Sequence, residues 1–452
     1  MNIVIAGAGK VGSTIAERLC SAGHDITLID EKQLRLDSAA NAMDVMTCCG
    51  NCAAPSILKA AEAGSADVFI AATGNDEANL VACQFARRMG AKHLAVRLRN
   101  QEYLESMDTL RDIMGISLAI NPDYVTAEEI SRVLQFPAAT QVDSFPDCEL
   151  EIVSFRIAEN SRLDGAALKE LPARFGHKVL VCAAERDGNY LIPDGNYVLR
   201  KGDNISVTAE PLALRKFFIA AGAYQKPVRN VLVLGGSRIA VFLTLLLEST
   251  GVDVTIIERS YQHCQLLAEK LQMADVVCGD GADTSVLHQS GLQDADGFVA
   301  LTNSDEDNVI LSMYANKTGV EKVISKVNND KFSDMLTNVF PNTVISPKYL
   351  VAERIEGYVR GLAHASDTST IEALYYLGSE KVTATEFVVG SKAACAGRSL
   401  AELRLKSGVL LAAVVRGGKS FLPDGRTVLE PGDRAVVVTA GRDLLNLDDI
   451  LL

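Results

Sequence analysis

The glycine-rich segment near the N-terminus carries the clearest chemical signal in the sequence. It reads "GAGKVG", from Gly7 to Gly12, and it lies between an apolar stretch and a helical pattern. In such a turn the first glycine permits a tight bend, the second lets the backbone approach a diphosphate, and the third allows close packing of helix and strand. The following helix directs free N–H groups and the positive end of its dipole at phosphate oxygens. The candidate phosphate-binding residues are Gly7, Ala8, Gly9, Lys10, Val11 and Gly12.

An acidic residue stands at the spacing that a dinucleotide-binding turn requires. Asp30 ends the second apolar stretch, about 20 residues beyond the glycines. Its carboxylate can accept hydrogen bonds from the diol of a ribose, whereas a 2′-phosphate at this place would meet a like charge. The pattern therefore predicts a site for NAD(H) rather than for NADP(H). A tight turn without any ligand is the alternative interpretation.

Further residues extend this candidate site along the same edge of the predicted sheet. Thr73, Gly74 and Asn75 follow the fourth apolar stretch, at the end of a strand where ligands bind in parallel sheets. Asn51 is placed to reach the adenosine part of a dinucleotide, and Arg97 is the best-placed cation for a phosphate. For both Asn51 and Arg97 a purely structural role is an equal alternative.

The second half of the chain repeats the first. The segment "ATGNDEAN" from Ala72 matches "LTNSDEDN" from Leu301, and "IPDGNYVLRKGD" from Ile192 matches "LPDGRTVLEPGD" from Leu422. The offset stays at roughly 230 residues over long stretches. A constant offset of this length indicates a tandem duplication.

The glycine turn of the second half, "GGSRIA", departs from the pattern of the first. Gly235 keeps the tight bend, but Ser237 replaces the second glycine and Ala240 replaces the third. Alanine is tolerated at the third position, whereas serine adds a β-carbon where a diphosphate would press against the backbone. The turn therefore predicts that this half binds a nucleotide more weakly, binds a different nucleotide, or binds none. The candidate residues of this half are Gly235, Gly236, Ser237, Arg238, Ile239, Glu258, Asp280 and Thr302, with Glu258 as the ribose acceptor.

The elements that must position these residues follow a repeated order. Each half begins with apolar strands that alternate with helical patterns, which predicts a Rossmann-like, doubly wound parallel sheet of the α/β class. A bridging helix follows, opened by Asn121–Pro122 in one half and by Ser346–Pro347 in the other. In the same way, Asp76 is expected to cap the helix after the fourth strand. Each half closes with a small α+β domain whose strands are joined by Pro-Asp-Gly and Gly-Asp turns. The expected parts are 1–120, 121–140, 141–224, 228–345, 346–366 and 367–452.

Composition and charge exclude several classes of protein. The net charge of −13 argues against nucleic acid and anionic lipid as direct partners. The apolar run from Ile239 to Leu247 is far too short to cross a bilayer, which needs about 20 residues, so direct membrane insertion is not expected. Ten scattered cysteines are typical of a cytoplasmic protein with reduced thiols.

Signals for catalysis or metal binding are weak. Cys49 and Cys52 form a Cys-x-x-Cys pair, but a redox pair needs a helix start, and small loop-filling residues are the favoured interpretation. No second Cys or His pair completes a zinc site, so no metal is expected. The histidines form no motif, and no catalytic triad is visible. Sensing is therefore favoured over turnover, and a tandem NAD-dependent oxidoreductase remains the alternative.

Several motifs together make the chain resemble the TrkA family, the cytosolic regulatory subunits of bacterial Trk potassium uptake systems. Besides the glycine turn and Asp30, the resemblance rests on "GNDEANLVACQFA", "RLRNQEY", "NPDYVTAEEI" and both "PDG" to "GD" segments. It covers essentially the whole chain. The departures lie in the second half, where Lys326 and Asn328 replace Arg97 and Arg99 in addition to the changes at Ser237 and Ala240.

The resemblance implies a fold, ligands and partners. Proteins of this family have two tandem RCK units, each with a Rossmann part and a C-terminal part. The family implies NAD(H), with ATP or ADP as further ligands, and a nucleotide-gated ring docked on a membrane potassium transporter at the inner face of the plasma membrane. The apolar stripe on the predicted bridging helix adds an expectation of self-association, at least to a dimer that completes a ring of RCK units.

Overall fold

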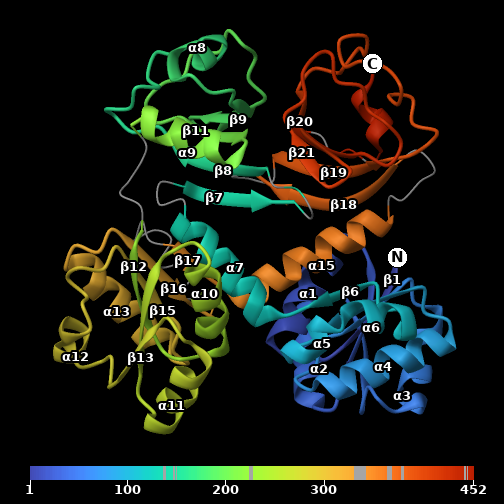
Figure 1. The fold of residues 1–452 in the computed structure, drawn as a ribbon. Coiled ribbons are helices and arrows are strands. Elements are labelled where there is room, and N and C mark those ends of the chain that lie inside the picture. The colour runs from blue at the N-terminus through green and yellow to red at the C-terminus, as the bar shows by residue number, and fades with distance from the viewer. Residues whose placement is uncertain are drawn as a thin grey trace. The chain divides into compact units, whose positions relative to one another are not determined.

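The chain folds into two compact units and passes twice through each (Figure 1). The first unit comprises Met1–Leu134 and Val228–Glu356, and the second comprises Gln135–Pro227 and Gly357–Leu452. Each unit therefore combines the equivalent parts of the two sequence repeats. The computed structural model describes residues 1–135, 139–145, 148, 150–222, 228–329, 343–363, 369–377, 381–441, 444 and 446–452.

The N-terminal repeat contributes a parallel sheet to the first unit. Its strands are β1 (Asn2–Ala6), β2 (Asp25–Asp30), β3 (Met46–Cys49), β4 (Val68–Ala71), β5 (His93–Arg97) and β6 (Leu118–Ile120). They lie in the order β3-β2-β1-β4-β5-β6, so the order reverses between β1 and β4. Ligands bind at such a switch point, outside the carboxyl ends of the strands. The connecting helices are α1 (Lys10–Ser21), α2 (Gln33–Ala42), α3 (Pro55–Ala60), η1 (Ala63–Ser65), α4 (Asp76–Met89), α5 (Gln101–Glu105) and α6 (Met107–Met114).

The second repeat builds an equivalent sheet in the same unit. Its strands are β12 (Asn230–Leu234), β13 (Asp253–Glu258), β14 (Asp275–Cys278), β15 (Gly297–Ala300), β16 (Lys322–Lys326) and β17 (Thr343–Ile345), in the order β14-β13-β12-β15-β16-β17. Its helices are α10 (Arg238–Glu248), α11 (Tyr261–Lys270), α12 (Thr284–Gln289) and α13 (Asp305–Lys317). The two sheets confirm the predicted pair of Rossmann-like folds.

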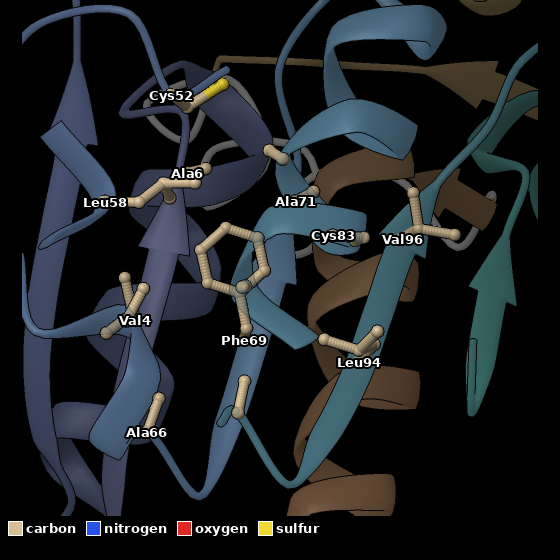
Figure 2. Close-up of a cluster of buried hydrophobic side chains, with 14 of the residues drawn as sticks. Val4, Ala6, Cys52, Leu58, Ala66, Phe69, Ala71, Cys83, Leu94 and Val96 are labelled. Carbon is tan, nitrogen blue, oxygen red and sulfur yellow. The ribbon is translucent and has the colours of Figure 1, made fainter. Parts of the chain in front are cut away.

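The core of the N-terminal sheet is centred on the aromatic ring of Phe69 in β4. This residue is fully buried and lies among apolar side chains from neighbouring strands and helices (Figure 2). Val4 from β1, Leu94 from β5 and Cys83 from α4 belong to the same cluster. Burial of a side chain of this size contributes about 1.5–3 kcal/mol relative to exposure. The packing therefore holds β1, β4 and β5 in fixed relation beneath the loops at their carboxyl ends.

The bridging helices connect the two repeats within the first unit. Helix α7 (Pro122–Gln135) buries Ile130 and Leu134 in the core of the second sheet, together with Val233. Helix α15 (Pro347–Ala363) reaches the N-terminal repeat, where Glu356 forms an ion pair with Arg18 of α1 at 3.1 Å. Each repeat therefore contributes its bridging helix to the other repeat.

Two antiparallel sheets form the second unit. The first consists of β7 (Ala139–Ser144), β8 (Glu151–Arg156), β9 (Leu180–Arg186), β10 (Asn189–Leu191) and β11 (Asn204–Ala209), in the order β10-β9-β11-β8-β7, with η2 (Leu168–Glu170), α8 (Leu171–Phe175) and α9 (Pro211–Ala220). The second consists of β18 (Ser369–Tyr376), β19 (Val382–Val389), β20 (Val409–Arg416), β21 (Lys419–Phe421) and β22 (Arg434–Ala440), in the order β18-β19-β22-β20-β21, with η3 (Leu447–Ile450). The equivalent strand orders confirm that this part of the chain is also duplicated.

Each Pro-Asp-Gly to Gly-Asp segment ends in a buried aspartate that pairs with a partly exposed arginine. Asp203 is almost fully buried and accepts two hydrogen bonds from the guanidinium of Arg186, both at 2.7 Å. Asp433 accepts the same pair of bonds from Arg416, at 2.8 and 2.6 Å. Removing one partner of such a pair leaves an uncompensated buried charge, which is strongly destabilising. These residues therefore serve the fold rather than a ligand site.

No helix in the described ranges is both long enough and apolar enough to span a bilayer. Likewise, the described residues contain no group of three or more His, Cys, Asp or Glu side chains that could hold a metal ion.

Candidate functional site

The glycine turn of the first repeat is sterically constrained at its two ends. Gly7 has a φ of +108°, and a β-carbon on it would lie 3.0 Å from the backbone of Ala72 and Thr73. A β-carbon on Gly12 would lie 1.7 Å from the carbonyl oxygen of Gly7. Both positions therefore require glycine. Gly9 differs, because a β-carbon there would meet only a side-chain atom at 4.0 Å.

Helix α1 begins directly after Gly9, and its first backbone N–H groups are unpaired. Gly9 is the N-cap residue, and it supplies no side chain to cap the helix. Among the described residues, no acceptor is found for the backbone N–H groups of Lys10, Val11 and Gly12, and the first helical bond runs from Ser13 N to the Gly9 oxygen at 2.9 Å. Open space above uncapped N–H groups is the arrangement that binds a phosphate.

Asp30 ties the glycine turn to the end of β2, where the sequence places it. Its Oδ2 accepts a hydrogen bond from the Ala8 N–H at 2.9 Å, and its Oδ1 accepts one from the Lys32 N–H at 2.9 Å. The half-exposed Arg35 adds a contact at 3.3 Å. The carboxylate is thus fixed beside the turn, and displacement of Arg35 toward solvent would release acceptor capacity for a ribose diol.

The loop after β4 is held by a buried amide that the sequence interpretation missed. Asn79 is fully buried, and its Oδ1 accepts bonds from the N–H and the hydroxyl of Thr73 at 3.0 and 2.5 Å. Its Nδ2 donates to the Arg97 carbonyl oxygen at 2.9 Å. The second repeat has the same arrangement, with Asn308 bound to Thr302 and to the Lys326 carbonyl oxygen. The signal in the sequence was the asparagine shared by "GNDEAN" and "NSDEDN".

The expected capping role of Asp76 is wrong. The Asn75 side chain caps α4 instead, since its Oδ1 accepts from the Ala78 N–H at 2.6 Å. Asp76 is the first helical residue and is buried, and its Oδ2 accepts from the N–H groups of Arg99 and Asn100 at 2.7 and 2.8 Å. An acid at this position can either cap the helix or bind a neighbouring loop. The bonds to Arg99 and Asn100 show that Asp76 binds the loop after β5.

Arg97 lies beneath the loop after β4. Its Nη1 donates to the Thr73 carbonyl oxygen at 2.5 Å, and the residue is almost fully buried. Burial lowers its pKa to about 10, and the nearby charge of Arg99 adds to this effect. The guanidinium remains charged at neutral pH and supports the backbone of this loop. Asn51, by contrast, is exposed after β3, with its Oδ1 bound to the Ala53 N–H at 2.7 Å.

A cavity of about 520 Å³ lies at the corresponding edge of the second sheet. Gly235 has a φ of +94° and forms the tight bend as predicted. Glu258 at the end of β13 accepts from the Gly236 N–H at 2.9 Å and from the Ser260 N–H at 2.8 Å. Burial alone would raise the pKa of Glu258, but these two donors and the nearby His263 outweigh it and lower the pKa. The cavity wall brings together six predicted residues, Gly235, Gly236, Ser237, Glu258, Asp280 and Thr302.

Two predicted residues of the second repeat lie outside this cavity wall. Ile239 is buried in the apolar core beneath α10. The Arg238 guanidinium points toward α7, where its Nε lies 3.1 Å from Asp123. Arg238 instead lines another cavity of about 500 Å³ in the first unit, together with Gly74 and Arg99 of the N-terminal repeat.

Ser237 changes the helix N-terminus of the second repeat. It is the N-cap of α10, and its hydroxyl accepts from the Ala240 N–H at 3.4 Å. The hydroxyl therefore occupies the place that remains open above Gly9 in the first repeat. A serine N-cap stabilises a helix by satisfying one of its free donors, and that donor is then not available to a diphosphate.

Cys49 and Cys52 do not lie at the start of a helix, which a redox pair of this spacing needs. Cys49 is exposed at the end of β3, whereas Cys52 is buried, and α3 begins only at Pro55. Burial raises the pKa of the Cys52 thiol, which opposes formation of the reactive thiolate. The geometry thus favours the loop-filling interpretation.

Comparison with known families identifies the chain. The TrkA-N domain model matches residues 3–122 and 231–347, and the TrkA-C domain model matches residues 152–218 and 384–452. The chain belongs to the TrkA family. This finding confirms the resemblance inferred from the sequence motifs and the division of each repeat into a TrkA-N and a TrkA-C part.

Relatives within the TrkA family extend over the full chain. The Trk system potassium uptake protein TrkA of Vibrio alginolyticus is 30% identical over 441 residues, which cover 97% of this chain and 95% of that protein. A TrkA homolog of Archaeoglobus fulgidus is 29% identical over 451 residues and covers both chains completely. The solved structure of the GsuK channel bound to NAD has a TM-score of 0.63 at 17% identity and covers 97% of this chain and 76% of that chain, which confirms the fold.

Proposed function

We propose that this chain is the nucleotide-sensing regulatory subunit of a Trk-type potassium uptake system. The observation that carries the proposal is the glycine turn of the first repeat, with Asp30 beside it and an uncapped α1 above it, in a member of the TrkA family. NAD(H) occupies this site, with its diphosphate on the N–H groups of α1 and a ribose on Asp30. The second repeat binds NAD(H) more weakly than the first, because Ser237 caps α10 and leaves one helix donor fewer for phosphates, and ATP or ADP are its candidate ligands.

The site is connected to the bridging helix through a short chain of contacts. Asp76, the first residue of α4, fixes the backbone of Arg99 in the loop after β5, and Arg99 lies 3.7 Å from Asp123 at the start of α7. Asp123 also pairs with Arg238 of the second repeat. A nucleotide that favours one conformation of the loop after β5 would therefore bias the packing of α7 on the second sheet. Such a ligand shifts the equilibrium only by its differential affinity for the two states.

The proposed partner is a membrane-embedded potassium transporter subunit, which holds this chain at the cytoplasmic face of the membrane. The chain itself would not insert into the bilayer. Residues 1–120 and 228–345 would act as sensing domains, and two or more copies would complete a ring of RCK units. The packing of α7 supports this assembly, because this helix belongs to one repeat and packs on the sheet of the other.

The test combines binding with transport. We expect calorimetry to show NAD(H) binding that weakens about tenfold or more in Asp30→Ala, since charge-assisted bonds worth roughly 1.5–3 kcal/mol each are lost. In liposomes that contain the transporter partner, addition of the chain should make rubidium uptake depend on NAD(H). Unchanged affinity in Asp30→Ala would contradict the assigned site. Steady oxidation of NADH with a metabolite would instead support a tandem NAD-dependent oxidoreductase.

A further inference from the structure

Two cysteines meet beside Glu258 at the edge of the second sheet. The thiol of Cys264, near the start of α11, donates to the Glu258 carbonyl oxygen at 3.3 Å. Cys278 ends β14 and pairs in register with Glu258. The same carbonyl oxygen accepts from the N–H of Gly279, the residue after Cys278, at 3.0 Å. One oxygen atom therefore binds both the side chain of Cys264 and the backbone next to Cys278.

The two thiols also affect each other and differ in exposure. Burial raises the pKa of Cys264 to about 11, and a hydrogen bond to Cys278 adds to this effect. Cys264 is buried and Cys278 is exposed, so a small oxidant in solution reaches Cys278 first. An accessible thiol beside a second, resolving thiol is the arrangement of redox-sensitive cysteine pairs. The raised pKa belongs to the resolving partner and not to the thiol that reacts first.

The first repeat has only one of these two cysteines. Cys49 pairs in register with Asp30, as Cys278 does with Glu258. The place of Cys264 is taken in α2 by Leu36, which is buried and has no sulfur. The thiol pair is therefore a feature of the second repeat, and the first repeat supplies a natural comparison for it.

We propose that Cys264 and Cys278 form a reversible disulfide when a peroxide oxidises the protein, and that this bond lowers nucleotide affinity at the second pocket. Peroxide first transfers an oxygen atom to the Cys278 sulfur, which becomes a sulfenic acid as the O–O bond breaks and water leaves. The Cys264 sulfur then attacks the Cys278 sulfur, and the hydroxyl leaves as water with the Cys264 proton. Two electrons pass from the thiols to the peroxide, and a dithiol reductant returns them.

The bond acts on the pocket because residues adjoining both cysteines line it. His263 precedes Cys264, Gly279 follows Cys278, and both belong to the wall of the cavity of about 520 Å³. A disulfide holds its sulfur atoms at about 2.05 Å, which is closer than two thiols in contact. Its formation therefore draws the start of α11 toward the end of β14 and narrows the cavity between them. The cross-link itself needs no nucleotide, whereas its effect on affinity rests on the proposed function.

Peptide mapping of the full chain tests the cross-link. The reduced protein is treated with hydrogen peroxide, its free thiols are alkylated under denaturing conditions, and it is digested with trypsin. Cleavage after Lys270 separates the cysteines, so the disulfide joins peptide 260–270 to peptide 271–317. We expect this linked pair in the wild type and its loss after reduction with dithiothreitol. Cys264→Ser keeps a donor for the Glu258 carbonyl oxygen but should abolish the pair.

Calorimetry with ADP tests the effect on the pocket, with the first pocket saturated by NAD(H). Glu258→Ala identifies the part of the signal that belongs to the second pocket. Peroxide should cause a loss of ADP affinity in the wild type that dithiothreitol reverses, and Cys264→Ser should bind ADP equally in both states. Cys49→Ser, the same change at the equivalent strand end of the first repeat, is the matched control and should respond like the wild type.

The outcomes separate this inference from the proposed function. Cys278 oxidised to a sulfinic acid, or linked elsewhere while the Cys264 thiol stays free, would overturn the pair. So would a Cys278 thiol that survives peroxide after the exposed Cys49 is oxidised. A cross-link that leaves Glu258-dependent ADP binding unchanged would refute the effect on affinity. If no ADP binding depends on Glu258 in either state, the proposed nucleotide site is refuted, and the peptide map alone still decides on the disulfide.

Discussion

The two glycine turns have the same bend but differ at the N-terminus of the helix that follows. In the first repeat, Gly9 leaves α1 uncapped and the space above it open. In the second, Ser237 caps α10 with its own hydroxyl. The acid beside each turn makes equivalent bonds to the backbone, so the two turns differ at the start of the helix and not at the acid. A duplicated fold can thus retain the acid beside its turn while a single side chain changes the donors that remain free at the start of the following helix.

The largest expected effect comes from the third glycine of the first turn. Gly12→Ala would place a β-carbon 1.7 Å from the Gly7 carbonyl oxygen, so the turn must open. We expect a loss of at least about 3 kcal/mol in the free energy of unfolding and loss of NAD(H) binding at this site. Urea denaturation and calorimetry measure these two quantities.

Gly74→Ala is the stability control for this change, because a β-carbon on Gly74 would meet nothing within 4 Å. The second repeat already has Ala240 at the position of Gly12, so its turn accommodates a β-carbon. A Gly12→Ala variant with unchanged stability and affinity would show that the two turns are interchangeable there.

The second prediction transfers the serine cap to the first repeat. Gly9 has an extended backbone that accepts any residue, and its surroundings leave room for a side chain. Gly9→Ser should therefore raise helix stability by a few tenths of a kcal/mol and yet weaken NAD(H) binding about tenfold or more. The melting temperature should rise slightly in thermal unfolding, whereas the NAD(H) affinity measured by calorimetry should fall. A variant that loses stability along with affinity would indicate a folding defect instead of a blocked phosphate site.

The third and smallest effect concerns Glu258 and pH. Backbone donors lower its pKa below the ordinary value of 4.5, so the folded state favours the carboxylate. This contribution to stability is present above the ordinary pKa and is lost as the pH falls through the lowered value.

The matched variant for this effect is Glu258→Gln, which cannot ionise. It should be less stable than the wild type at about pH 7, and the difference should fade at about pH 3. Denaturant titrations at both pH values measure this difference in the free energy of unfolding. A difference that persists unchanged at low pH would mean that the charge of Glu258 is not what stabilises the turn.

Much of this arrangement followed from the sequence, because local patterns determine it. Alternating strands and helices predicted both sheets, and the spacing from Gly7 placed Asp30 beside the turn. The errors arose where distant segments meet. Asp76 has the position of a helix cap, but its partner is the loop after β5. Arg238 belongs to the glycine turn in sequence, yet its guanidinium pairs with Asp123 of the other repeat. No local pattern reveals such contacts, since they depend on how α7 packs on the second sheet.

The two repeats are proposed to bind NAD(H) unequally, and NAD(H) stoichiometry tests this inequality most directly. Calorimetry on the wild type should show one NAD(H) site per chain, in the first repeat. Ser237→Gly combined with Ala240→Gly should raise the stoichiometry toward two by opening the N-terminus of α10. Two NAD(H) sites of equal affinity in the wild type would show that Ser237 does not obstruct the diphosphate, and they would contradict the account.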